Sequence, residues 1–187
     1  VYNVNFLLTS NYGCINVFNS TATVWPLPES NFSLVDVCLG ESVEFSDLSQ
    51  VSNINTANSI NSWNWNFGEG GTSNQQNPIY TYNAAGTYNA TLTVTTTNGC
   101  SDLTTLPVTV HPTPVVSFIG QSLDGCSPIC PSFTSTSTVD GPSTISNYNW
   151  ILSNGMNQNS SDSEYIECLE NSSSETITLG LTLIVTS

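Results

Sequence analysis

Apolar and polar residues alternate along most of this chain with a period of two, which is the pattern of strands that bury one face. Three segments, 43–46, 63–67 and 88–95, show the alternation most clearly. Their apolar positions are Val43, Phe45, Trp63, Trp65, Phe67, Tyr88, Ala90, Leu92 and Val94. No segment sustains the helical period, so the sequence predicts an all-β fold.

Turn residues separate these strands at short intervals. The turn signals are Gly68-Glu69-Gly70-Gly71, Asn77-Pro78, Ala85-Gly86 and Asn98-Gly99. They divide roughly 85 residues into about seven short strands, which matches an immunoglobulin-like β-sandwich.

The sequence also repeats itself. At an offset of 86 residues the segment 2–32 falls on 88–118, and the matched pairs include Tyr2 with Tyr88, Phe6 with Leu92, Gly13-Cys14 with Gly99-Cys100, and Trp25 with His111. At an offset of 88 Cys38 falls on Cys126 and Phe45 on Phe133, and after a short deletion Trp65 and Gly70 fall on Trp150 and Gly155. Three copies are therefore present in the chain.

Two proline-containing connectors mark the boundaries between the copies, Val24-Trp25-Pro26-Leu27-Pro28 and Val110-His111-Pro112-Thr113-Pro114. Proline removes a ladder donor and favours an extended, semi-rigid linker. We therefore expect residues 1–28 to be the last strands of a truncated repeat, 29–114 a complete repeat, and 115–187 a repeat without its last strand. Both ends are expected to be cut from a longer protein.

Charge excludes several classes of function. The chain has 14 acidic residues and no Lys or Arg, so its net charge is -14. Phosphate and anionic lipid surfaces bind cationic side chains, so we expect neither nucleic-acid binding nor membrane insertion. The six cysteines form no CxxC pair and are expected in disulfides, which points to an extracellular, cell-surface location.

The sequence offers few candidate catalytic residues. His111 is the only histidine, and its counterpart in the first copy is Trp25, so we expect a linker-packing role rather than a base or ligand. The carboxylates of the middle copy are scattered and are expected to be solvated surface charge; they include Glu41, Glu44, Asp47, Glu69 and Asp102. No enzyme and no cofactor is expected.

Calcium is the one ligand for which acidic and Asn-rich turns supply the right oxygen atoms. The acidic pairs that we weigh are Asp36 with Glu41 and Asp124 with Asp140. No spaced loop comparable to an EF-hand is present, so calcium stays an alternative to the expectation of no cofactor.

Three ordered motifs in the complete copy carry a family resemblance: Trp63-Asn64-Trp65-Asn66-Phe67-Gly68-Glu69-Gly70, then Asn77-Pro78-Ile79-Tyr80-Thr81-Tyr82, then Ala85-Gly86-Thr87-Tyr88. They resemble the signature of the polycystic kidney disease (PKD) repeat domains. Asn66 and Glu69 stand where that family usually has aspartates, and the third copy keeps only Trp150 and Gly155. The positions carried over are Trp63, Trp65, Phe67, Gly68, Gly70, Tyr82, Gly86, Tyr88, Trp150 and Gly155.

This resemblance implies tandem immunoglobulin-like β-sandwiches joined by short Pro-containing linkers, without catalysis, on surface proteins. The disulfide-bearing variety resembles repeats in giant exported proteins of Bacteroidota, including gliding-motility adhesins. Trp65 and Phe67 are expected to fill the core, the glycines 68, 70 and 71 to adopt positive backbone torsions, and Tyr88 to act like a tyrosine corner.

Matching the copies gives a cysteine pairing. Cys38 and Cys100 belong to one copy and are expected to pair, and Cys130 and Cys168 are extra to the third copy and are expected to pair with each other. The repeat partners of Cys14 and Cys126 fall outside the sequence, so both are expected to be unpaired in this fragment.

The functional hypothesis is a structural or adhesive stalk whose partners are the neighbouring repeats and possible surface polysaccharides or proteins. One alternative is a carbohydrate-binding module, for which Trp25 and Tyr148 are the candidate contact residues. Another is an accessory domain of an exported hydrolase.

Overall fold

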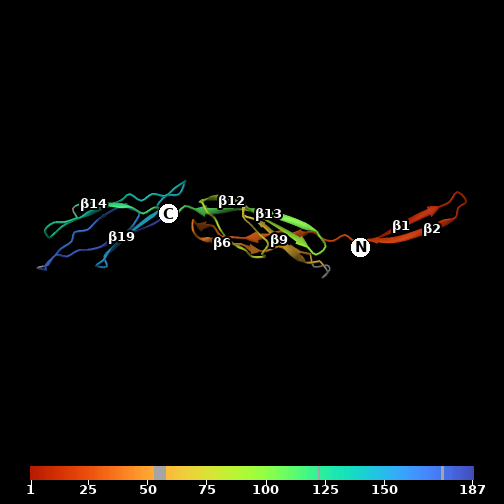
Figure 1. The fold of residues 1–187 in the computed structure, drawn as a ribbon, viewed down its shortest axis with the longest axis horizontal. Coiled ribbons are helices and arrows are strands. Elements are labelled where there is room, and N and C mark those ends of the chain that lie inside the picture. Colours follow the sequence, from red (N-terminus) through yellow and green to blue (C-terminus); the bar gives the residue numbers. More distant parts are fainter. Residues whose placement is uncertain (53–57, 122, 174) are drawn as a thin grey trace. The chain divides into compact units, whose positions relative to one another are not determined.

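The computed structural model describes residues 1–52, 58–121, 123–173 and 175–187, and the regular elements in these ranges are all β-strands (Figure 1). By internal contacts the chain divides into two compact units. The first comprises 1–35, 42–81 and 87–108, and the second comprises 36–41, 82–86 and 109–187. Among the described residues there is no helix that is long and apolar enough to span a membrane.

The first copy is a single antiparallel hairpin. Strand β1 (Tyr2–Thr9) pairs with β2 (Ile15–Ala22) in an unbroken register from Tyr2–Ala22 to Thr9–Ile15. Every residue of both strands is exposed, including Phe6 and the Phe18 opposite it. The apolar face that the repeat places inside a sandwich is therefore bare here.

The described residues of the middle copy form eleven strands. They are β3 (Pro28–Glu29), β4 (Phe32–Ser33), β5 (Val37–Cys38), β6 (Ser42–Glu44), β7 (Ser46–Asp47), β8 (Gln50–Val51), β9 (Ile60–Asn66), β10 (Thr72–Ser73), β11 (Ile79–Thr81), β12 (Gly86–Thr96) and β13 (Ser101–His111). One sheet has the order β10-β9-β12-β13-β5, and the pairs β11-β6, β3-β8 and β4-β7 complete the strand pairing.

Strand alternation decides which side chains enter the core of this copy. In β12 every second residue from Ala90 to Thr96 is buried, as the period of two predicts. Trp65, the second-to-last residue of β9, is fully buried opposite Leu92 of β12 and Ser73 of β10. Its Nε1 donates to the backbone oxygen of Gln75 at 2.8 Å. An indole whose N–H has a partner can be buried without a desolvation penalty.

Two phenylalanines pack against Trp65, Phe32 from β4 and Phe45, the residue between β6 and β7. The ring of Phe32 meets it edge-on at a centroid distance of 5.0 Å and 77°, and the ring of Phe45 lies at 5.4 Å. Such tilted and edge-to-face pairs are favoured by the quadrupoles of the rings. The aromatic trio therefore joins the sheet that contains β9 to strand β4 and to the segment around Phe45.

In the third copy, the residues that the structure describes form six strands in two three-stranded sheets. They are β14 (Phe118–Gln121), β15 (Ser132–Ser135), β16 (Asn147–Leu152), β17 (Asn157–Ser160), β18 (Glu164–Ile166) and β19 (Leu181–Thr186). The orders are β14-β15-β18 and β17-β16-β19. Its core cluster contains Trp150, Leu152, Tyr165 and Leu183.

Trp150 occupies the place of Trp65. It is fully buried between Gln158 of β17 and Leu183 of β19, and Phe118 meets it edge-on at 5.4 Å and 77°. Phe133 lies at 6.3 Å from it. The packing of the middle copy therefore recurs, although the motif around Trp150 has largely been lost. Unlike Trp65, Trp150 finds no acceptor for its Nε1 among the described residues.

We predict that Trp65→Ala lowers the free energy of unfolding of the middle copy by about 3–5 kcal/mol, because it removes a fully buried aromatic side chain and leaves a cavity. Leu103→Ala, at a position that is 61% exposed, is the control and should change it by less than about 0.5 kcal/mol. Urea unfolding followed by circular dichroism measures both. Equal losses in the two variants would contradict the central role of Trp65.

Candidate functional site

The described part of the middle copy has an open depression of about 540 Å³. It is lined by Asp47, Ser49, Gln50, Val51, Ser59, Ile60, Trp63 and Gln76. Asp47 is the one carboxylate in this lining, so the depression does not offer the pair of converging acids that glycoside hydrolysis requires.

Asp47 is the polar centre of this depression. Its Oδ2 accepts hydrogen bonds from Trp63 Nε1 at 2.6 Å and from Gln76 Nε2 at 3.0 Å, and its Oδ1 accepts from the backbone N–H of Ser49 at 2.9 Å. Its own N–H donates to Asn77 Oδ1 at 2.8 Å. One side chain thus connects β7, β9 and the segment before β11. Our expectation that Asp47 is solvated surface charge is wrong, because this carboxylate is half-buried and surrounded by donors.

The environment keeps the carboxyl of Asp47 ionised. Burial by itself would raise its pKa, but hydrogen bonds from Ser49, Gln76 and Trp63 together outweigh burial and hold the pKa below the ordinary value. An ionised carboxylate whose oxygens already accept three hydrogen bonds has little capacity left as a general acid or base. The geometry indicates a structural connection rather than a catalytic group.

A carboxyl whose pKa is lower in the folded than in the unfolded state stabilises the folded protein. This stabilisation is fully present above the unfolded-state pKa of about 3.9 and is lost as the pH falls through the lower folded-state pKa. We therefore predict that Asp47→Asn is less stable than the native protein at pH 7, by about 1–2 kcal/mol for the lost charged acceptor. The difference should shrink towards about pH 2–3 as the native carboxylate is protonated.

Thermal unfolding of the two proteins between pH 7 and pH 2 measures this dependence. Asp140→Asn, which changes an exposed carboxylate of the third copy, is the matched control, and its curve should run parallel to the native one. A constant difference between Asp47→Asn and the native protein across the whole range would contradict the assignment.

The glycine turn after β9 holds the family motif. Gly68 and Gly70 have φ of 89° and 97°, as expected from the sequence. Gly71 is not among the glycines with positive φ, so that part of the expectation is wrong. Glycine is needed at position 71 because there is no room for a side chain: a Cβ there would overlap the ring of Tyr80. That ring stacks on Phe67 at 4.1 Å.

Asn66 and Glu69, which stand where the family usually has aspartates, both accept hydrogen bonds at this turn. Asn66 Oδ1 accepts from the backbone N–H of Gly68 at 2.9 Å, which closes an Asx turn. Glu69 Oε1 accepts from the hydroxyl of Tyr80 at 3.0 Å. Burial of the Tyr80 hydroxyl, reinforced by Glu69, raises the pKa of Tyr80 above its ordinary value. The two departures from the family signature therefore preserve the turn.

The two positive-φ glycines of this turn differ in their surroundings. A Cβ on Gly68 would lie 2.8 Å from the backbone oxygen of Asn89, whereas a Cβ on Gly70 meets nothing within 4 Å. We predict that Gly70→Ala costs about 1 kcal/mol of torsional strain and that Gly68→Ala costs clearly more, since backbone must shift as well. Chemical denaturation of both variants gives the comparison, and equal costs would refute the close approach to Asn89.

The other carried-over positions are distributed through the two copies. Trp63 is half-buried against Asp47, Tyr82 is buried, and Tyr88 is half-buried. Gly86 begins β12, and Gly155 forms the turn between β16 and β17. A tyrosine-corner role for Tyr88 stays a prediction.

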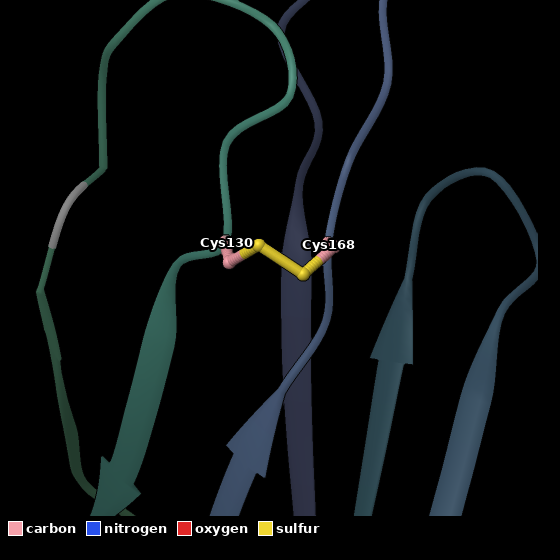
Figure 2. The surroundings of a disulfide bond; sticks show 2 residues. All are labelled: Cys130 and Cys168. Atoms are coloured by element: carbon pink, nitrogen blue, oxygen red, sulfur yellow. A yellow bond between two sulfur atoms is a disulfide. The ribbon is translucent and has the colours of Figure 1, made fainter.

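Cys130 and Cys168 are joined by a disulfide, the pairing that matching of the copies predicts (Figure 2). Cys130 precedes β15 and Cys168 follows β18, and the two strands are antiparallel neighbours. Next to the cysteines Ile129 and Leu169 exchange both backbone hydrogen bonds, so the cysteines form the adjacent non-hydrogen-bonded pair, with their Cα atoms 4.0 Å apart. The disulfide closes the two strands at this end of the sheet.

The predicted pairing of Cys38 with Cys100 is wrong, because both carry free thiols. Cys38 lies beside His111 at the end of β13, whereas Cys100 immediately precedes the first residue of the same strand. Eleven residues of β-strand separate the two positions, which is roughly 35 Å. Sequence matching could not show this separation, because it depends on the pairing of β5 with the far end of β13. Cys14 and Cys126 are also free.

The remaining acidic candidates bind backbone. Asp36 Oδ1 accepts from the N–H of Thr109 at 2.7 Å and Glu41 Oε2 from the N–H of Cys38 at 3.0 Å. Asp102, expected to be surface charge, instead accepts from the N–H of Ser30 at 2.8 Å. Within the described ranges no three His, Cys, Asp or Glu residues gather as a metal site would require. Calcium binding stays a prediction.

These features define an all-β chain of immunoglobulin-like sandwich repeats. A family model of the PKD domain matches residues 28–110. The PKD1 domain of Vibrio anguillarum Epp is 32% identical, with a TM-score of 0.41, and the match covers 45% of this chain and 93% of that one. The PKD1 domain from Vibrio cholerae metalloprotease PrtV is 36% identical, also with a TM-score of 0.41, covering 45% and 96% respectively. The chain belongs to the PKD domain family through its middle copy.

A structure that describes carbohydrate-binding modules of the β-sandwich superfamily is 15% identical, with a TM-score of 0.40 over 85% of this chain and 83% of that one. We draw nothing about ligands from that likeness. No curated protein matches the chain. PKD domains are generally non-catalytic modules.

Proposed function

We propose that the chain is a non-catalytic stalk segment of a large secreted repeat protein at the cell surface. The observation that carries the proposal is the path of the chain through the middle copy. Strand β13 begins next to the turn whose Asn98 is hydrogen-bonded to Asn58, and Asn58 in turn is hydrogen-bonded to Pro26 of the incoming linker. The strand runs eleven residues to His111, after which the outgoing linker follows directly. A sandwich whose linkers attach at opposite ends of a long strand adds length with each copy.

The incoming linker is held by side chains. Asn58 is buried, and its Nδ2 donates to the backbone oxygen of Pro26 at 3.2 Å. Its Oδ1 in turn accepts from Asn98 Nδ2 at 3.0 Å. Proline already restricts the linker backbone, and these hydrogen bonds attach it to the copy that follows. Such a connection favours a stiff joint, which a stalk requires.

Charge and covalent chemistry fit the exterior of a cell. Fourteen carboxylates without a single Lys or Arg make neighbouring chains repel each other and keep a long polymer soluble. The disulfide between Cys130 and Cys168 suits an oxidising compartment. Both features support an extracellular location.

More specifically, we propose that the stalk has an adhesive role, as in a gliding-motility adhesin of the Bacteroidota type. Its partners would then be surface polysaccharides or proteins. This role is supported by the sequence resemblance and by the exposed apolar and aromatic side chains of the hairpin β1–β2. The neighbouring repeats of the same chain are the other proposed partners.

The alternative is an accessory or carbohydrate-binding module of an exported hydrolase. The likeness to a PKD domain of a Vibrio metalloprotease favours the accessory role. The two candidate sugar-contact residues give it less support, since Trp25 is half-buried and Tyr148 packs against the core cluster of the third copy. Neither belongs to an exposed aromatic platform.

The stalk proposal is tested with a chain in which the middle copy occurs twice, made of residues 1–114 followed by residues 29–187 and called the duplicated chain below. We predict that its maximum dimension in small-angle X-ray scattering, measured under reducing conditions, exceeds that of the native chain by roughly 35–45 Å, the length of β13 with its linker. An unchanged maximum dimension would mean that successive copies fold back on each other and would refute the stalk.

A further inference from the structure

The free cysteines of this chain fall into two structural types, and the first type lies in a hairpin turn. Cys14 and Cys100 close turns of the same geometry. In one, the N–H of Ser10 donates to the oxygen of Cys14 at 2.9 Å, and in the other, the N–H of Thr96 donates to the oxygen of Cys100 at 2.8 Å. In addition, the hydroxyl of Ser10 accepts from the N–H of Cys14 at 3.1 Å. The hydroxyl of Thr96 accepts from the N–H of Cys100 at 3.2 Å. We call these the turn cysteines.

The second type lies at the other end of a copy. Cys38 is exposed and pairs with His111 in the short parallel ladder between β5 and β13, and the N–H of Leu39 donates to the oxygen of His111 at 2.8 Å. Cys126 is its counterpart in the third copy by sequence and is also exposed. We call these the terminal cysteines, because each belongs to the end at which the chain leaves its copy.

The linker brings the two types together across a junction between copies. Trp25 of the first copy corresponds to His111, so a terminal cysteine of the first copy would lie beside Trp25 as Cys38 lies beside His111. The next residue, Pro26, is hydrogen-bonded to Asn58, and Asn58 to Asn98. Asn98 is two residues from the turn cysteine Cys100, which is half-buried and therefore still accessible.

We propose that the terminal cysteine of each copy forms a disulfide with the turn cysteine of the copy that follows it. This inference rests on the proposed array of successive copies. It also accounts for all four free thiols. Cys14 and Cys100 would each pair with a preceding copy's terminal cysteine, and Cys38 and Cys126 with a following copy's turn cysteine, so no two of the four are partners. The link would add a covalent connection to a joint that proline and Asn58 already restrict.

The reaction is an oxidation of two thiols by a disulfide oxidant of the thiol–disulfide exchange class, such as oxidised glutathione. One cysteine thiolate attacks the oxidant and releases one glutathione thiolate. The second cysteine thiolate then attacks the mixed disulfide and releases the other. One S–S bond forms between the copies, the oxidant is reduced by two electrons to two glutathione molecules, and each cysteine loses one proton.

The duplicated chain allows a test with matched variants. In every variant Cys14 and Cys126 are replaced by Ser, Cys130 and Cys168 are kept, and two of the four remaining cysteines are kept. The junction variant keeps Cys38 in the upstream middle copy and Cys100 in the downstream one. The reverse variant keeps Cys100 upstream and Cys38 downstream, and the same-copy variant keeps both upstream.

Each variant is equilibrated with oxidised and reduced glutathione, unfolded, and titrated with a maleimide to count free thiols. We expect the junction variant to lose both free thiols and the mass of two hydrogen atoms, because its two sulfurs face each other at high effective concentration. The reverse and same-copy variants should retain both free thiols. A protease specific for acidic residues then maps the linked peptides, since the chain has no Lys or Arg for trypsin.

Retention of both thiols by a junction variant whose circular dichroism and unfolding midpoint match the reverse variant would overturn the proposal. Oxidation of all three variants to the same extent would overturn it as well. If the junction variant were misfolded, the duplicated chain with all its native cysteines provides the second measurement, in which loss of fewer than two free thiols refutes the link. A longer maximum dimension without a disulfide would leave the stalk proposal intact, so the two failures are distinguishable.

Discussion

Both sandwich copies depend on one buried tryptophan that a phenylalanine meets edge-on. Phe32 and Trp65 in the middle copy, and Phe118 and Trp150 in the third, have the same interplanar angle of 77° and centroid distances of 5.0 and 5.4 Å. A large, rigid, buried ring fixes which residues can lie opposite it, because side chains of a sheet alternate and the interior is close-packed. The register of the neighbouring strands follows from that constraint.

The surface features of the middle copy are attached to this core. Trp63, two residues before Trp65, lies on the same face of β9 and donates to Asp47, which ties β9 to β7. Phe67, two residues after Trp65, is buried and supports the stacked ring of Tyr80 beside the glycine turn. Alternation along one strand thus builds a core, an anchored carboxylate and a turn from a single stretch of sequence. The third copy keeps the tryptophan and has no equivalent of Asp47, since Ser135 stands opposite Phe118 where Asp47 stands opposite Phe32.

In the proposed stalk, the ends of the copies matter more than a pocket. The linkers enter and leave at opposite ends of β13, and the side chains gathered there are a buried asparagine, prolines and free thiols. The disulfide of the third copy, by contrast, lies within one sheet between antiparallel neighbours. Two uses of cysteine therefore occur in one chain, one inside a copy and, in our proposal, one between copies. This division suits a chain whose mechanical weak points are its joints.

The sequence by itself determined the fold class, the repeat and the identity of the core, because a period of two, regularly spaced turn residues and an internal match are local properties of the chain. It also determined the partnership of Cys130 with Cys168, two cysteines present in the third copy alone. Contacts between residues far apart in the sequence were decided only by the tertiary structure. The separation of Cys38 from Cys100 depends on the parallel pairing of β5 with the far end of β13, and that pairing joins residues more than seventy positions apart. The role of Asp47 depends on Trp63 and Gln76 converging on one carboxylate, which no spacing in the sequence indicates.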